Sequence, residues 1–357
     1  MANKLSPFSF HVLDSANRID TGLLNRVLNF QGQVNNVSFY QHVHIFDFIN
    51  GNKGYHAILF VIEEQDEIIA SLMVLKIRQG PTCCPLFNER LLVTGYPVIC
   101  NMVSDRKQVL SFMIQKIADF AKRQSVFIEF RPHVPDLVLD SVLKQNQYQY
   151  TDHLNLLVHL TNHQSLWKEL HESKRRQVKK SQRNGLVVEP CSGEIELTDF
   201  YSIVQNLYKN RVKKPYPNYA FFLNFYKELQ LKRKAVILIA KWKGQVVGGM
   251  LCPYIEGETI YEWYIAGQDR DNVKNGIYPS VLLTWSAIEY GLKHGFKTFD
   301  FMGAGNPSIP YGVRDFKKRF GGELVNAGRY IYVNKPFIYK MLGRYFKFKN
   351  FYLNKFK

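Results

Sequence analysis

The chain contains one arrangement of elements twice, and this duplication limits its fold more than any other feature. Residues 57–73 have the pattern of an apolar strand, a polar turn and a second apolar strand, and residues 235–251 repeat that pattern without a gap. β-Branched side chains are frequent in both segments, which favours hairpins over helices. Because internal similarity of this kind indicates one structural unit used twice, both halves are expected to share one architecture.

The similarity continues with a helix that leads into a strand. Residues 110–130 carry apolar side chains at helical spacing and end in an apolar run, and residues 278–301 do the same. Alignment of the two segments places Glu129 and Asp300 at equivalent positions. A helix between two strands predicts a parallel strand pair with a right-handed crossover. The predicted fold class is therefore α/β, with two domains of mixed sheet flanked by helices.

The length of 357 residues also suits two domains. We predict a first domain over residues 1–160 and a second over residues 161–335, because residues 161–165 have the composition of a turn and a helix cap. A basic, aromatic tail over residues 336–357 follows the second domain.

The formal net charge is +17, and an excess of this size predicts anionic partners. Nucleic acid, phosphorylated metabolites and an acidic membrane surface all stay open, as does the simpler interpretation of an ordinary basic enzyme. The five cysteines are not spaced as a disulfide framework or a zinc site, so we expect reduced thiols, no metal and a cytoplasmic protein. No apolar run approaches the roughly 20 residues that a membrane span requires.

Residues 164–184 predict a basic helix that Ser165 caps and Gly185 ends. Its second half has no acidic residue and carries six cations: Lys174, Arg175, Arg176, Lys179, Lys180 and Arg183. Two interpretations stay open. The helix either presents a solvated face, or it contacts the phosphates of a nucleic acid or a lipid-linked headgroup.

Three segments resemble the Fem-type peptidoglycan aminoacyltransferases (FemABX): the basic segment 174–185, Phe-Asp-Phe-Met-Gly at 299–303, and residues 312–323. The resemblance covers most of the chain and is strongest over residues 165–335. It implies two GNAT-like domains, which have the acyl-CoA N-acyltransferase fold. It also implies transfer of an amino acid from aminoacyl-tRNA to an amine of a peptidoglycan precursor peptide. Broader relatives, the FemAB-like acetyltransferases, occur in envelope and exopolysaccharide pathways.

The resemblance assigns the chemistry to the second copy. Acyl transfer to an amine requires a neutral amine, a donor for the oxyanion and a stabilised leaving group. The resemblance implies that Lys317 stabilises the developing charge and that Phe316 packs on the donor. The alternative for Lys317 is a lysine at the surface of a basic helix.

Two carboxylates of the second copy are candidate bases. Asp300 ends the strand after the crossover helix, where open α/β sheets bind ligands, and could orient or deprotonate the amine. The alternative is that Asp300 pairs with a nearby basic residue. Glu262 lies in a predicted strand over residues 260–265, in which alternation places Glu262 and Tyr264 on one face.

The remaining candidates concern the acceptor. The family binds the phosphates of its precursor with an Arg and a Tyr from a similar stretch, which implies roles for Arg211, Lys214 and Tyr219. Tyr264 and Arg314 complete the predicted substrate-binding set. A polar surface loop is the alternative interpretation of this stretch.

The donor site departs from that of acyl-CoA enzymes. GNAT enzymes that use acyl-CoA usually carry Gln/Arg-x-x-Gly-x-Gly/Ala before the crossover helix, where backbone amides hold the pyrophosphate. At that place only Gly276 is kept, with Val273 and Tyr278 at the outer positions. The departure counts against ordinary acetyl-CoA binding and favours aminoacyl-tRNA or an unusual donor. The donor is thus aminoacyl-tRNA or an acyl-CoA, and we expect no tightly bound cofactor.

The residues after 334 combine seven Lys/Arg and eight Phe/Tyr with no acidic residue. A segment of this composition can lie on an anionic membrane, which would place the protein at the inner face of the membrane. A C-terminal helix packed on the second domain is the alternative.

The leading hypothesis is a FemAB-type N-acyltransferase or aminoacyltransferase that acts on an amine of a cell-envelope precursor, such as a peptidoglycan peptide. It predicts a monomer with a phosphate-bearing acceptor, one active centre in the second domain, and a first domain that shapes the acceptor cleft. One alternative is a CoA-dependent N-acyltransferase that acts on an amino sugar of capsule or exopolysaccharide. The other is a non-catalytic protein that binds RNA or a membrane.

Overall fold

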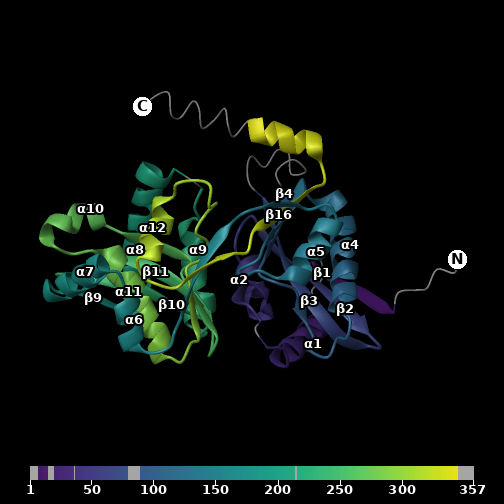
Figure 1. Cartoon of the computed structure of the whole chain (residues 1–357), viewed down its shortest axis with the longest axis horizontal. Helices are drawn as coiled ribbons and strands as arrows, with labels where there is room; N and C mark the ends of the chain where they lie inside the picture. Colours follow the sequence, from purple (N-terminus) through teal and green to yellow (C-terminus); the bar gives the residue numbers. More distant parts are fainter. Residues whose placement is uncertain (1–6, 15–19, 36, 79–88, 214, 345–357) are drawn as a thin grey trace. The chain divides into compact units, whose positions relative to one another are not determined.

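The computed structural model describes residues 7–14, 20–35, 37–78, 89–213 and 215–344 (Figure 1). The chain forms two compact units. The second unit is His153–Asn326, and the first unit contains Met1–Asp152 together with Ala327–Lys357. The boundary therefore precedes the predicted position at residue 160, and the end of the predicted second domain belongs to the first unit.

The first unit contains an eight-stranded mixed sheet with the order β1-β2-β3-β4-β6-β16-β7, and β5 pairs with β3. Its elements are β1 (Phe8–Asp14), α1 (Thr21–Gly32), η1 (Phe39–Gln41), η2 (Val43–Ile45), α2 (Phe46–Asn50), β2 (Tyr55–Glu64), β3 (Glu67–Arg78), β4 (Glu89–Thr94), β5 (Val98–Ile99), α4 (Arg106–Gln124), β6 (Phe127–Arg131), α5 (Leu137–Gln145), β7 (Gln149–Thr151) and β16 (Arg329–Val333).

The predicted hairpin of the first copy is confirmed as β2 and β3, which pair antiparallel. Its two turn residues, Gln65 and Asp66, both have positive φ angles, as a two-residue hairpin turn of the right twist requires. The predicted crossover is confirmed as well. Helix α4 lies between β4 and β6 in the chain, and these two strands are parallel. The apolar face of α4 is buried on the sheet, including Met113 and Ile117.

The second unit repeats this arrangement, with the order β15-β8-β14-β12-β11-β10-β9 and β13 paired with β11. Its elements are β8 (Leu154–His159), α6 (His163–Glu169), α7 (Glu172–Arg183), β9 (Leu186–Pro190), α8 (Glu194–Leu207), the π-helical turn η3 (Tyr208–Val212), α9 (Tyr219–Phe225), η4 (Tyr226–Gln230), β10 (Ala235–Trp242), β11 (Gln245–Ile255), β12 (Thr259–Tyr261), β13 (Tyr264–Gly267), α10 (Asp269–Asn272), η5 (Val273–Asn275), α11 (Pro279–Lys293), β14 (Thr298–Asp300), α12 (Gly312–Lys318) and β15 (Glu323–Asn326).

The two copies exchange their last strands. β7 ends the first sheet, but the chain then enters the second sheet as β8, which lies between β14 and β15. In the same way, the chain leaves β15 and returns to the first sheet as β16, which lies between β6 and β7. This exchange explains the displaced unit boundaries, since each sheet needs a strand from the other half of the chain.

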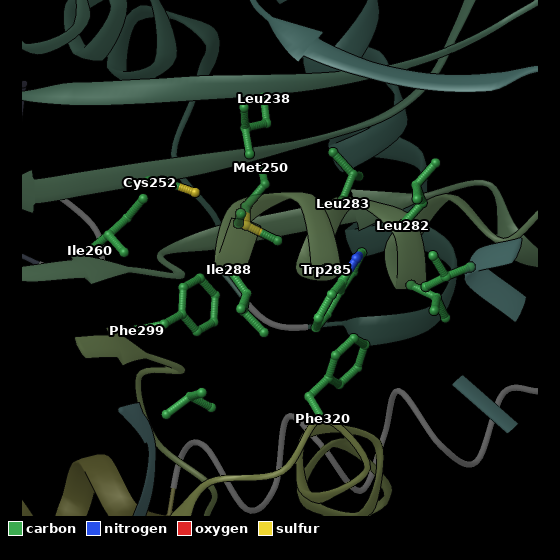
Figure 2. Close-up of a cluster of buried hydrophobic side chains, with 14 of the residues drawn as sticks. Leu238, Met250, Cys252, Ile260, Leu282, Leu283, Trp285, Ile288, Phe299 and Phe320 are labelled. Atoms are coloured by element: carbon green, nitrogen blue, oxygen red, sulfur yellow. The ribbon is translucent and has the colours of Figure 1, made fainter. Parts of the chain in front are cut away.

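The core of the second unit lies between α11 and the sheet (Figure 2). Figure 2 shows Trp285 and Ile288 of α11 pointing toward Phe320 and Phe299, respectively. These four side chains are almost completely buried. Each one contributes about 1.5–3 kcal/mol relative to an exposed position, so the packing fixes α11 on the strands that carry the candidate site.

Two sequence predictions of local structure are wrong. The basic helix is broken, because Leu170, between α6 and α7 in the chain, adopts an extended backbone and buries its side chain in the core. Asn162 rather than Ser165 caps the first piece, and Asn162 accepts the Ser165 amide. The predicted strand over 260–265 is also interrupted: β12 ends at Tyr261 and β13 begins at Tyr264.

The predicted C-terminal tail is helical over residues 336–344, and the remainder of the tail lies outside the described residues. Phe337 and Met341 of this helix are largely exposed. Within the described ranges, no helix is both long and apolar enough to cross a membrane.

Candidate active site of the second unit

Three charged side chains of the second unit are buried together. Glu262 follows β12, Asp300 ends the parallel strand β14, and the Glu262 amide donates to the Asp300 carbonyl at 2.9 Å. Lys317 of α12 places its Nζ 3.6 Å from Glu262 Oε1. The exposed fractions are 4% for Glu262, 2% for Asp300 and 7% for Lys317. Burial of three charges is costly unless they neutralise and hydrogen-bond one another, so their proximity marks a candidate site.

Lys317 is buried and is not the surface lysine of the alternative interpretation. Its Nζ donates to the carbonyl oxygens of Phe301 and, at 3.1 Å, Gly303. Met302 and Gly303 both have positive φ angles, so the loop after β14 turns its carbonyls toward the ammonium. With three N–H donors, Lys317 can bond to two carbonyls and still face Glu262.

Asp300 organises the same loop. One of its oxygens, Oδ1, accepts from the Met302 amide at 2.7 Å and from Asn155 Nδ2 at 2.9 Å. Asn155 in turn accepts the Gly303 amide at 2.7 Å. Sequence analysis missed Asn155 because the predicted domain boundary placed it in the first domain, whereas β8 belongs to the second sheet.

Glu262 is the carboxylate whose environment suits proton transfer. Burial raises its carboxyl pKa to about 6, and the charge of Asp300 acts in the same direction. The Lys317 ammonium and a hydrogen bond from Thr284 Oγ1, at 3.4 Å from Oε2, oppose this rise. A base with a pKa near the working pH transfers protons efficiently. Thr284 had no sequence signal, because it is a small polar residue among apolar residues on the buried part of α11.

Phe316 lies beside a second buried lysine. The Lys174 ammonium lies 4.0 Å from the centre of the Phe316 ring and 5.5 Å from that of Phe320. Lys174 is 5% exposed, and burial lowers the pKa of its amine to about 8, with the charge of Arg319 acting in the same direction. Lys174 therefore differs from the exposed phosphate contact that was predicted, because its charge is held against aromatic rings inside the unit.

The other cations of the predicted basic helix divide into two groups. Arg175 donates to the carbonyls of Lys168 at 2.9 Å and Leu170 at 2.6 Å, so it caps the C-terminal end of α6. The side chains of the second group are exposed on α7: Arg176, Lys179, Lys180 and Arg183. Arg176 also pairs with Glu172 one turn earlier.

The turn before α11 bonds its amides within the unit. Gly276 and Ile277 donate to the carbonyls of Val273 and Asn272. The Tyr278 amide donates to Ser181 Oγ of α7 at 3.0 Å. The Ser280 amide donates to Asp269 Oδ1 at 3.1 Å, and the Ser280 hydroxyl bonds to the same carboxylate.

Helix α7 also covers Gly276 from outside. A Cβ added at Gly276 would lie 2.4 Å from Lys180 Cε and 2.6 Å from Asn184 Nδ2. Gly276 has a φ of +69°, and Asn184 donates to the Asn275 carbonyl at 2.8 Å. The glycine is therefore required for the turn and for the close approach of α7.

The predicted acceptor residues that the structure describes lie on four elements of the second unit. Arg211 is exposed in the π-helical turn η3. Tyr219 begins α9, and its hydroxyl bonds to Thr198 Oγ1 at 2.9 Å. Lys214 lies outside the described residues.

Tyr264 lies two residues after Glu262, and Arg314 lies on α12, the helix of Lys317. Tyr264 begins β13, directly after the interruption that carries Glu262, and packs its ring among aromatic side chains. Arg314 donates to the carbonyls of Asn306 and Ile309 at 2.8 Å each, so it holds the loop between β14 and α12.

Comparison with known proteins gives the class. A family profile described as "Acetyltransferase (GNAT) domain" matches residues 169–318. The solved structure of FemX has a TM-score of 0.67 at 15% identity, over 91% of this chain and 98% of that chain. A tandem GNAT protein from the clavulanic acid biosynthesis pathway has a TM-score of 0.56 at 10% identity, over 91% and 99%. L-PGS from Bacillus licheniformis has a TM-score of 0.53 at 14% identity, over 88% and 92%. No curated protein matches the chain.

Two mixed α/β units and the matched domain define a tandem GNAT-fold protein, and the chain is an acyltransferase of this class. Residues 169–318 match the GNAT acetyltransferase family, and the predicted resemblance to the FemAB-like group is confirmed at the level of the fold. The predicted fold class, two GNAT-like domains with mixed sheets, is confirmed too. Enzymes of this fold bind the acyl donor as a substrate, most often acyl-CoA.

Proposed function

We propose that the protein transfers an aminoacyl group from aminoacyl-tRNA to an amine of a cell-envelope precursor. The observation that carries the choice of donor is the closed turn before α11. A CoA pyrophosphate binds to free N–H groups at such a turn, but those of residues 276, 277, 278 and 280 donate within the unit. The Asp269 carboxylate also occupies the N-terminus of α11, where it would repel a phosphate. The resemblance to FemABX proteins supports aminoacyl-tRNA in place of acyl-CoA.

The buried charges of the second unit supply the chemistry of the proposed reaction. The acceptor nitrogen attacks the carbonyl carbon of the aminoacyl ester, a C–N bond forms, and the C–O bond to the ribose breaks. Glu262 accepts the proton that the amine loses, and that proton then passes to the ribose oxygen that leaves. Lys317 stabilises the Glu262 carboxylate and adds positive charge where the oxyanion develops. Asp300 holds the loop that places Lys317.

The exposed cations of α7 suit the donor in this proposal. Arg176, Lys179, Lys180 and Arg183 lie on the helix that covers the closed turn. Contacts of this kind with RNA phosphates release counterions, so the affinity for tRNA should fall steeply with salt. The exposed Phe337 and Met341 of the C-terminal helix are consistent with a precursor that is presented at an anionic membrane.

The test supplies charged tRNA, acetyl-CoA and candidate precursor peptides to the protein and measures labelled product. We expect transfer from aminoacyl-tRNA, with kcat/KM rising with pH around the raised pKa of Glu262, and loss of transfer in Glu262→Gln and Lys317→Met. Lys318→Met is the matched control, because Lys318 is the exposed neighbour of Lys317 on the same helix. Transfer from acetyl-CoA alone would refute the proposed donor. No transfer from any donor, together with salt-sensitive RNA binding, would favour a non-catalytic protein.

A further inference from the structure

The first unit has its own cluster of charged side chains, which the proposed reaction does not use. Glu129 on β6 is 4% exposed and occupies the position equivalent to Asp300. Arg131 Nε and Nη2 donate to its two carboxylate oxygens at 2.8 Å each. A bidentate pair of this geometry already satisfies and neutralises the carboxylate.

Two more guanidinium groups nevertheless face the same carboxylate. Arg90 Nη1 lies 3.4 Å from Glu129 Oε2, and Arg329 Nη1 lies 3.6 Å from Oε1. The Arg90 Nε is buried and has no hydrogen-bond acceptor among the residues that the structure describes. Burial lowers the pKa of Arg90, and the charge of Arg131 lowers it further. Arg90 is therefore a cation in excess of what Glu129 requires.

The second copy lacks this cationic surrounding at the equivalent positions. In each copy the carboxylate ends or nearly ends a central strand, with one parallel and one exchanged antiparallel neighbour. Each arginine lies two residues along its strand from Glu129 or from a residue that pairs with Glu129. The same count from Asp300 gives the equivalent positions in the second copy: Asn155 for Arg329, Met302 for Arg131, and Thr259 for Arg90. Three arginines in the first copy therefore replace an amide, a thioether and a hydroxyl in the second.

Strand pairing also shows that these arginines share one face of the first sheet. Arg90 and Arg131 lie on the face of Glu129, and Arg329 lies on that face too, because it is two residues from Ile331, which pairs with Glu129. The opposite face carries Ile128 and Phe130, which pack into the core with α4 and α5. The arginine side chains keep 19% (Arg90), 30% (Arg131) and 34% (Arg329) of their surface exposed, so a ligand can reach them.

We propose that Arg90, Arg131 and Arg329 form a binding site for a phosphoryl group on the first unit. Glu129 anchors one edge of the guanidinium groups and leaves their other edges to a second anion. A tetrahedral phosphoryl dianion has enough oxygens to accept bonds from several guanidinium groups at once, and arginine is the side chain suited to such contacts. The site is independent of the proposed transfer reaction, because none of its residues belongs to the Glu262, Asp300 and Lys317 group.

The test measures binding of inorganic pyrophosphate to the full chain by calorimetry at low salt, and locates it by the NMR signals of the arginine Nε–H groups. Arg90→Gln should weaken binding about tenfold to a hundredfold, as expected for one charge-assisted hydrogen bond. Glu129→Gln should strengthen it, since the neutralising carboxylate is lost. Arg26→Gln is the matched control, because Arg26 pairs at 3.0 Å with another buried carboxylate, Glu63, which has one guanidinium partner among the residues that the structure describes. It should leave the affinity unchanged.

A second arm uses vesicles of phosphatidylcholine with phosphatidic acid, which present the same phosphoryl chemistry on a lipid. Weaker binding of either probe to Arg90→Gln than to the unaltered protein supports the site. The probe that is affected shows whether the phosphoryl group comes from a soluble ester or a lipid headgroup. Arg90→Lys keeps the charge and serves as a check on folding, which circular dichroism follows in parallel. Affinities for both probes that are equal in the unaltered protein and in folded Arg90→Gln would overturn the proposal. They would leave the cluster as an ion-pair network alone.

Discussion

Replacing Glu262 by Gln should change how the stability of the second unit depends on pH. The carboxyl is buried, and its pKa is raised from an ordinary value of 4.5 to about 6. The folded unit therefore holds a proton on Glu262 more tightly than the unfolded chain does. For an acid with a raised pKa, this contribution to stability is fully present below pH 4.5 and is lost as the pH rises through 6.

The expected magnitude follows from the same difference. A rise of the pKa from 4.5 to about 6 corresponds to about 2 kcal/mol of stability that the unaltered unit loses between those pH values. Glu262→Gln has no proton to lose there, so its stability relative to the unaltered protein should increase by about that amount. The lost attraction to Lys317 adds an offset of the opposite sign. The contribution of Glu262 is therefore measured by how the free energy of unfolding changes with pH, and not by its value at one pH.

Urea unfolding followed by tryptophan fluorescence measures this slope. The chain has four tryptophans, all within the second unit: Trp167, Trp242, Trp263 and Trp285. Glu196→Gln is the control from the same unit. Burial alone would raise the pKa of Glu196, but hydrogen bonds from Lys241 and Ser192 make it lower than usual. The contribution of Glu196 to the stability of the unit should therefore grow as the pH rises. A stability difference between Glu262→Gln and the unaltered protein that stays constant from pH 4.5 to 7 would refute the argument.

Two further substitutions test the packing of α7. Gly276→Ala should destabilise the second unit by about 1–2 kcal/mol for the backbone strain, and by more because the added Cβ would displace the Asn184 amide from its hydrogen bond to the Asn275 carbonyl. Gly244→Ala, at a positive φ with open space around it, measures the strain alone in the same urea titration. Lys174→Met should stabilise the unit at pH 7 by less than about 3 kcal/mol, because burial lowers the pKa of the amine from 10.5 to about 8 and the folded state holds an unfavourable charge below that pH, while the contact of the ammonium with the Phe316 ring offsets part of that cost. This gain should disappear as the pH rises toward 10.5, and a gain that is independent of pH would contradict the argument.

The repeated fold could be predicted because each copy carries its own local signals. The hairpins and the crossover helices depend on short-range patterns of apolar and β-branched residues, and these appear where predicted. The strand exchange could not be predicted in this way. β8 and β16 are apolar strands that suit either sheet, and only long-range pairing decides which sheet accepts them.

The candidate site was predicted in part for the same reason. Asp300, Glu262 and Lys317 were recognised one by one from strand position and motif, and the structure brings them together. Their surroundings were not recognised, since the partners come from distant segments: Asn155 from the exchanged strand, and Thr284 from an apolar helix. Alternation along residues 260–265 also failed, because the strand breaks at Glu262 to place the carboxylate beside Lys317.

The exchanged strands give the duplication a chemical consequence. In the second sheet, β8 brings the neutral amide of Asn155 to Asp300, and the carboxylate becomes part of a loop that positions Lys317. In the first sheet, β16 brings the guanidinium of Arg329 to Glu129, and the carboxylate becomes the anchor of a cationic cluster. The same place in the two sheets thus receives a neutral group in one case and a cation in the other, each from the strand that the other half of the chain supplies.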